Sequence, residues 1–232
     1  MNTNKTLRCA VVLCIAVTLQ VNLYSQGSSL TQNQIECQAM LGLFSASQSQ
    51  SEATTGETRG RLNALGGGLG ISFPASDKVA LRANLLYQPS GSTYESNTAG
   101  SSFSGSICKY YLMLNALGSY NFFMNSYIMA RLVGGLGVGT FLSGSSTNKY
   151  EYMGIKEENT SKIESKDVRS PDVRLLLGVE AGYPLSKGLS LFGMIQYEHG
   201  LTNIVPDVSG APQNITIKNN SIGLTFGARQ TF

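Results

Sequence analysis

The sequence contains little charge, no tryptophan and only one histidine. Asp, Glu, Lys and Arg together make up 13% of the 232 residues, whereas disordered chains typically carry a high charge density. The 26 glycines argue against a helical bundle, because glycine is a poor helix former. The formal net charge is +3 and no basic stripe is present to neutralise phosphates, so we expect no nucleic-acid partner.

Long apolar runs are also missing, apart from one near the start of the chain. Lys5 and Arg8 precede the run CAVVLCIAVTLQV, after which the composition becomes polar at YSQGSS. This order is typical of a secretory signal peptide, and the run is too short for a membrane-spanning helix. We therefore predict a signal peptide over residues 1–25, cleaved before Gln26, and a single mature domain over residues 26–232.

Cysteine is scarce in the predicted mature chain, which keeps only Cys37 and Cys108. Their spacing does not match a pattern of metal ligands. On the strand assignment given below, both side chains face outward from strands that are not neighbours, so a disulfide would need a shorter Cα separation than the barrel permits. We predict two separate thiols packed as small hydrophobic groups, with no metal site and no cofactor.

The mature sequence instead shows alternation between apolar and polar residues. The segment VRLLLGVEAGY places Val173, Leu175 and Leu177 on one face, with Arg174 and Glu180 on the other. A period of two indicates β-strands, and about ten residues is the length a tilted strand needs to cross a bilayer. Eight segments follow this pattern, over residues 35–45, 61–73, 79–88, 107–121, 127–141, 172–183, 189–200 and 217–231.

The connections between these segments alternate between short and long. Tight turns rich in Pro, Ser, Asn and Gly are expected at 74–78, 122–126 and 184–188, and long polar loops include 142–170 and 201–216. Short periplasmic turns and long extracellular loops are typical of outer-membrane barrels. We therefore predict an all-β fold, an eight-stranded antiparallel up-and-down transmembrane β-barrel in the lipid of the cell outer membrane.

Charged residues within the strands gather on the face that would line the barrel interior. The interior of an eight-stranded barrel is just filled by side chains, so we predict a plugged lumen with paired opposite charges. A narrow, porin-like diffusion channel is the alternative. The predicted lumen charge network comprises Glu36, Arg82, Lys109, Arg131, Arg174, Glu180, Glu198 and Arg229.

Aromatic residues lie near the ends of the predicted strands, where Tyr and Phe would form the two interfacial girdles in the absence of Trp. The girdle beside the short turns would contain Phe73, Tyr120, Phe122, Phe123, Tyr127 and Tyr183. The girdle beside the long loops would contain Tyr87, Phe141 and Tyr197.

Four segments carry a family resemblance through their order and spacing over residues 35–232. They are SDKVALRANLLYQPSG, DVRLLLGVEAGYPL, LSLFGMIQYEHGLTNI and the closing IGLTFGARQTF. In these segments the chain resembles the small outer-membrane β-barrel proteins of Bacteroidetes-type bacteria, the porin-family or PorT-like proteins. The resemblance implies insertion by the barrel-assembly machinery and leaves open a role in a secretion or assembly machine, but it implies no established substrate.

The single histidine, His199, lies beside Glu198 at the loop end of a predicted strand, where some outer-membrane barrels carry catalytic residues. Adjacent strand residues face opposite sides, so this pair cannot readily act as a base and its orienting group. We predict no catalytic residue and no enzyme. The favoured role is structural or surface-interacting, with the long loops open to an extracellular partner.

The chain ends on an aromatic residue rather than on a polar tail. Ile222, Leu224, Phe226, Ala228, Gln230 and Phe232 share one parity, and we predict that this row faces lipid. The last strand is predicted to pair with the first, because an open edge cannot be satisfied in lipid. A terminal Phe resembles the signal that barrel-assembly machinery recognises, so Phe232 is the predicted assembly signal.

Overall fold

The computed structural model describes residues 34–50, 57–98, 101–125, 127–205 and 216–232. Its strands pair antiparallel throughout, and no helix in these ranges is long and apolar enough to cross a membrane. The strands are β1 (Glu36–Gln50), β2 (Glu57–Gly60), β3 (Leu62–Pro74), β4 (Val79–Thr98), β5 (Ser101–Met124), β6 (Met129–Tyr152), β7 (Ile155–Ile163), β8 (Asp172–Ser186), β9 (Leu189–Gly200) and β10 (Ile217–Thr231).

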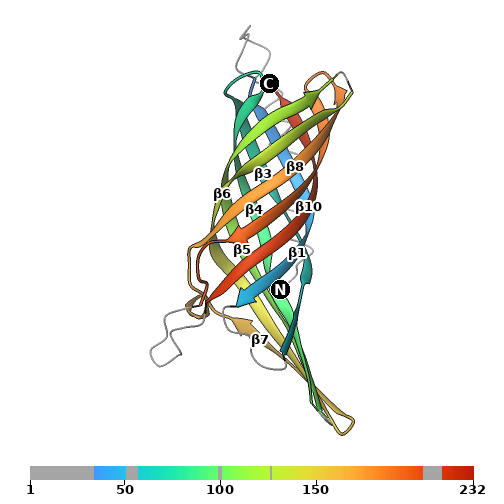
Figure 1. Cartoon of the computed structure of the whole chain (residues 1–232), viewed down its shortest axis with the longest axis vertical. Coiled ribbons are helices and arrows are strands. Elements are labelled where there is room, and N and C mark those ends of the chain that lie inside the picture. Colours follow the sequence, from blue (N-terminus) through green and yellow to red (C-terminus); the bar gives the residue numbers. More distant parts are fainter. Residues whose placement is uncertain (1–33, 51–56, 99–100, 126, 206–215) are drawn as a thin grey trace.

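Eight of these strands form a closed ring in the order β1, β3, β4, β5, β6, β8, β9, β10. Figure 1 shows the barrel from the side. The pairing of β1 with β10 closes the ring over its full length, from Glu36 opposite Thr231 to Gln50 opposite Ile217. The backbone amide of Phe232 adds a hydrogen bond of 2.9 Å to the carbonyl of Ile35. The predicted eight-stranded barrel and its closing pair are therefore confirmed.

The two faces of the wall differ as the alternation predicts. Leu41, Leu65 and Leu114 point outward and are 62%, 73% and 58% exposed in the protein without its lipid. The interior holds buried polar side chains together with small apolar clusters, such as Leu117, Val133, Leu176 and Met194. Cys37 and Cys108 are free thiols on the non-neighbouring strands β1 and β5, as predicted. Apolar groups thus meet lipid and polar groups meet each other.

The short turns lie at one end of the barrel, the periplasmic end in this class of protein. The predicted turn at 74–78 is nearly right, because β3 ends at Pro74 and β4 begins at Val79. The other two lie further along the chain, since β5 continues to Met124 and β8 to Ser186. Asn125 makes the first of these turns, its side-chain oxygen accepting bonds from the amides of Tyr127 and Ile128 at 2.9 and 2.7 Å.

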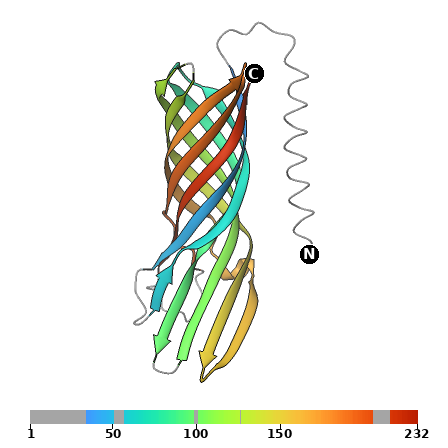
Figure 2. The same cartoon turned by 90° about the vertical axis from the view of Figure 1, so that its right-hand side faces the viewer.

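Two of the long polar segments at the opposite end, between β4 and β5 and between β6 and β8, are largely strands rather than the loops predicted from the sequence. β4, β5 and β6 are 20, 24 and 24 residues long and continue well beyond the predicted strand ends at 88, 107 and 141. Together with β2 and β7 they form a five-stranded sheet in the order β2–β4–β5–β6–β7, which projects past the barrel in Figures 1 and 2. We call residues 57–60, 92–98, 101–109, 143–152 and 155–163 the extracellular sheet.

Candidate functional site

The barrel interior contains two groups of paired charges, the first in the periplasmic half. Glu180 accepts hydrogen bonds from Arg82 at 2.8 Å and from Arg229 at 2.5 Å. Glu36 accepts two bonds of 2.8 Å from Arg131, which lies four strands away around the ring in either direction. These five residues, the periplasmic cluster, tie opposite walls of the barrel together.

The second group, the loop-side cluster, is built around Arg174. Its guanidinium donates to Asp172 at 2.7 and 2.9 Å and to Glu198 at 3.0 Å. Gln88, Gln196 and Ser221 donate to Glu198 at 2.5, 2.7 and 3.0 Å, and Asn219 donates to Asp172 at 2.8 Å. Arg174 thus faces two carboxylates, and each carboxylate has at least one further polar partner, which is the condition for tolerating these charges in a buried position.

Asp172 is the lumen residue that the sequence prediction missed. Seven of the eight predicted residues form these two clusters, and Lys109 lies on the inward face of β5, close enough to Asp172 for attraction. Lys109 makes no ion pair within the described part of the chain. With Asp172 included, the four arginines face four carboxylates. The signal was present, since Asp172 has the same parity as Arg174.

The interior is filled rather than open. Arg174, Glu180 and Glu198 each have 0% of their surface exposed, as has Gln88. A continuous water-filled pore would leave lining side chains in contact with solvent. The paired charges and amides therefore fill the barrel interior at these positions, as expected for a narrow ring of eight strands.

The extracellular sheet has two distinct faces. Strand alternation and register make one face continuous with the lumen wall and the other continuous with the lipid-facing wall. β6 has a bulge at Leu142, because Tyr111 lies opposite Phe141 while Tyr110 lies opposite Ser143. The extra residue shifts the parity of β6 by one, so its side chains beyond the bulge still share faces with their partners on β5. We call the two faces the axial face and the lateral face.

The axial face carries a row of aromatic rings across three strands. Phe103 lies between Tyr94, with ring centroids 5.5 Å apart, and Tyr150, 4.7 Å apart. The Tyr94 hydroxyl donates a hydrogen bond to the side-chain oxygen of Asn148. Tyr94 also packs over Gly105, where a Cβ would collide with its ring. The rings hold β4, β5 and β6 together beyond the membrane.

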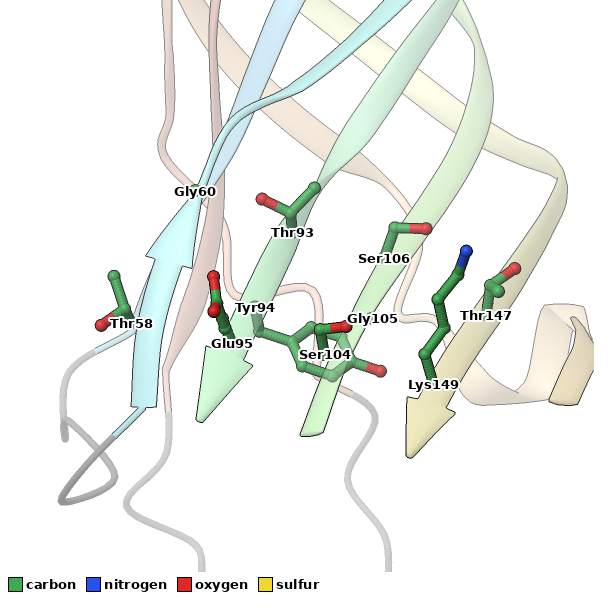
Figure 3. Close-up of a pocket in the computed structure, with 10 residues that line it drawn as sticks. All are labelled: Thr58, Gly60, Thr93, Tyr94, Glu95, Ser104, Gly105, Ser106, Thr147 and Lys149. Atoms are coloured by element: carbon green, nitrogen blue, oxygen red, sulfur yellow. The ribbon is translucent and has the colours of Figure 1, made fainter. Parts of the chain in front are cut away.

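The lateral face is hydrophilic and is built mainly from Ser, Thr, Lys and Glu. Lys149 and Glu158 form an ion pair of 3.3 Å, and the hydroxyls of Thr147 and Thr160 are 3.1 Å apart. A hollow of about 350 Å³ opens here, and Figure 3 shows its lining side chains. Its lining comprises Thr58, Gly60, Thr93, Tyr94, Glu95, Ser104, Gly105, Ser106, Thr147 and Lys149.

The remaining predicted positions lie on the outer wall or at its ends. His199 is half-buried on the outward side of β9, whereas Glu198 points inward, so the two side chains do not meet. Phe232 follows β10 and is half-buried. Tyr87 stacks on Tyr110 at 4.7 Å at the outer surface of the wall. Phe141 was wrongly placed in the loop-side girdle, because it points inward and packs edge-on against Tyr111 at 5.9 Å.

The closed ring, the apolar outer wall and the polar interior define an outer-membrane β-barrel. The sequence matches the family described as outer membrane protein beta-barrel domain over residues 24–205. The chain belongs to this family and is a protein of the cell outer membrane. No curated protein matches the sequence.

Solved structures of similar shape are also outer-membrane proteins. The outer membrane protease OmpT from Escherichia coli superposes with a TM-score of 0.51 at 10% identity, covering 89% of this chain and 99% of OmpT. Neisserial surface protein A gives a TM-score of 0.46 at 14% identity, covering 85% of this chain and 97% of that one. OprG from Pseudomonas aeruginosa gives 0.46 at 12% identity, with 86% and 95% covered. At such low identity these likenesses concern the fold alone.

Proposed function

We propose that this protein is a non-enzymatic surface-interaction protein, in which a plugged barrel anchors the extracellular sheet as a recognition platform. The observation that carries the proposal is the length of β4, β5 and β6, which continue together beyond the barrel. A barrel needs only about ten residues a strand to cross the membrane. The additional residues make a paired, ordered sheet with two chemically different faces, a structure with no use in crossing lipid.

The lumen supports an anchoring role better than a transport role. Glu180 and Glu198 are fully buried and bonded on several sides, so ions would have to break these bonds to pass. Planar-bilayer recording of the folded protein should therefore give no discrete conductance. Regular conductance steps that change when Glu180 is neutralised would favour the channel reading instead.

The recognition role can be tested by shortening the sheet. In one variant, residues 92–107 and 145–162 are each replaced by Asn-Gly turns, which join residues already paired in the parent protein. The barrel should still show heat-modifiable migration on a gel. Cells displaying the full chain should bind a printed array of glycans and extracellular-matrix proteins, and cells displaying the shortened variant should not. Equal binding by both would overturn the proposal.

The absence of enzymatic activity is part of this proposal. His199 faces outward and Glu198 faces the lumen, so they do not make a base with an orienting partner. A protease or lipase activity of the purified protein that disappears in His199→Ala would contradict the proposal. The likeness to OmpT bears on the fold and transfers no activity.

Several sequence-based predictions remain proposals of this kind. The signal peptide at 1–25 lies outside the described residues, and the PorT-like resemblance rests on the sequence alone. A deletion strain with normal secretion and no cross-linked partner complex would dismiss a role in a secretion machine. Deleting Phe232 should lower the amount of protein inserted by the barrel-assembly machinery, and unchanged outer-membrane levels would contradict its role as an assembly signal.

A further inference from the structure

The lateral face of the extracellular sheet looks sideways over the membrane rather than toward the barrel axis. On β4 it continues the row that contains the lipid-facing residues Leu85 and Tyr87, and on β5 it continues the row of Leu112 and Leu114. Side chains of one parity stay on one side of a strand. Figure 2 shows the sheet leaving the barrel as an extension of its wall. The lateral face therefore adjoins the layer occupied by the headgroups of outer-leaflet lipids.

The hollow on this face has a defined floor and rim. The register places Glu95 of β4, Ser104 of β5 and Lys149 of β6 in one cross-strand row. Neighbouring strands are about 4.8 Å apart, so the backbones that carry the two charged residues are roughly 10 Å apart, with the short Ser104 side chain between them. Ser106 continues the floor toward the barrel, as Figure 3 shows. This width is suitable for one sugar ring.

The hydroxyl groups in the hollow are available to a ligand. Thr93, Ser104 and Ser106 make no side-chain hydrogen bond with other residues in the described parts of the chain, and all three line the hollow. A hydroxyl can both donate and accept, so a row of them suits a ligand that itself carries hydroxyls. At Gly60 a Cβ would collide with the Thr93 hydroxyl, so the missing side chain leaves that group uncovered.

The charge of the lateral face selects against an ionic ligand. Its acidic and basic residues balance, and they are Glu95, Glu151, Glu158, Lys149, Lys156 and Lys162. Lys149 pairs with Glu158 at 3.3 Å and Lys156 with Glu151 at 3.4 Å. Glu95 accepts a hydrogen bond of 2.9 Å from Asn97. The hollow thus offers hydroxyl groups to a ligand. Its lining residues provide neither an uncompensated positive charge for a phosphate nor an apolar floor for an acyl chain.

We propose that this hollow binds an uncharged sugar unit in the headgroup of outer-leaflet glycolipids in the same membrane. The inference rests on the proposed recognition role of the extracellular sheet and names the ligand class for its lateral face. Glu95 and Lys149 bind hydroxyls at the two edges of the sugar ring, while Thr93, Ser104 and Ser106 bind those on its face. Such contacts would hold the sheet against the glycan layer around the barrel.

The test uses the full-length mature protein in phosphatidylcholine nanodiscs. Binding is followed by saturation-transfer NMR and titration calorimetry, with an uncharged hexose oligosaccharide as the probe and intact lipopolysaccharide for comparison. The wild-type protein should bind the uncharged oligosaccharide with an affinity nearly independent of salt between about 50 and 500 mM, because an uncharged ligand has no charge to screen. The double variant Ser104→Leu with Ser106→Leu fills the floor and should bind at least about tenfold more weakly, a loss of about 1.4 kcal/mol.

The matched control is Ser145→Leu, the same change on the lateral face outside the hollow, which should bind as the wild type does. Heat-modifiable migration confirms that each variant is folded. Binding that falls steeply with salt, or that requires the phosphorylated lipid A portion, would overturn the inference in favour of an anion site. A further outcome is that the protein binds no saccharide while the array binding of the full chain is still lost in the shortened variant. That outcome would overturn this inference but would leave the proposed function supported.

Discussion

The lumen and the extracellular sheet are built from the same strands but follow opposite rules. Inside the barrel, Arg82 and Glu180 form an ion pair with both side chains fully buried. In the extracellular sheet, Lys149 and Glu158 form a pair in which the side chains are 58% and 57% exposed. A buried charge depends on its partner, whereas an exposed charge is already stabilised by water. The charges in the lumen are therefore needed for the stability of the fold, whereas the charges in the extracellular sheet can be changed with little loss of stability.

The largest effect is expected from Glu180→Gln, which removes the charge that Arg82 and Arg229 share. Buried Arg82 would lose its ionised partner and Arg229 would keep only Glu36, at 3.3 Å, so the free energy of unfolding should fall by about 3–5 kcal/mol. Urea unfolding in detergent micelles, followed by heat-modifiable migration, measures this change. A loss below about 1 kcal/mol would show that water or neighbouring groups compensate for the missing charge.

A second comparison uses one face of one strand. Leu114 and Ser106 both lie on the outward side of β5, the first in the barrel wall and the second in the extracellular sheet. Leu114→Arg should lower the stability in lipid by about 2–4 kcal/mol, because it places a charge within the hydrocarbon layer. Ser106→Arg should leave stability nearly unchanged. Equal losses for both would contradict the assigned membrane boundary. Unfolding titrations in phosphatidylcholine vesicles give both values.

Asp172→Asn tests the carboxylate that sequence reasoning missed. Arg174 would keep Glu198 but lose a charged partner bonded at 2.7 and 2.9 Å. Because a hydrogen bond to a charged group contributes about 1.5–3 kcal/mol, we expect a loss of stability in that range. The same urea titration applies, with Asn219→Ser as a milder change to the same cluster. An unchanged midpoint would mean that the charge of Asp172 contributes nothing measurable to stability.

The smallest effect is expected from Glu158→Ala in the extracellular sheet. Its pair with Lys149 is exposed to solvent, and exposed pairs contribute between about 0 and 1 kcal/mol. Urea unfolding should barely distinguish the variant from the wild type, and high salt should remove any remaining difference. A loss as large as that of Glu180→Gln would end the distinction between the two regions.

Much of the barrel could be predicted from local alternation. The apolar parity of Leu81, Leu114 and Leu177 must face lipid, so the sequence predicts the eight wall strands and the inward position of all eight proposed charges, seven of which join the two clusters. Phe141 was misplaced because its closeness to a loop outweighed its parity, which it shares with the inward residues Arg131 and Val133. The alternation pattern therefore predicts the orientation of Phe141 correctly, whereas its closeness to a loop does not.

The extracellular sheet could not be predicted in the same way. Segments such as STYESNT and SSFSGS each contain one aromatic residue among small and polar ones, and so they lack the repeated apolar alternation of the wall strands. Their strand structure comes from cross-strand partners, such as Phe103 between Tyr94 and Tyr150, which lie 9 and 47 residues away along the chain. Only pairing in three dimensions brings these rings together.

The sequence by itself determined which side of the wall each strand residue faces, because a period of two is a local property and lipid tolerates one arrangement of polar groups. The tertiary structure decided which charges meet. Arg131 reaches Glu36 across the barrel and Arg174 reaches Asp172 and Glu198, since the stagger of the closed ring sets the height of every side chain in the lumen. It also decided that the polar extensions of β4, β5 and β6 pair with each other and with β2 and β7 into one sheet, which carries a hollow on its lateral face.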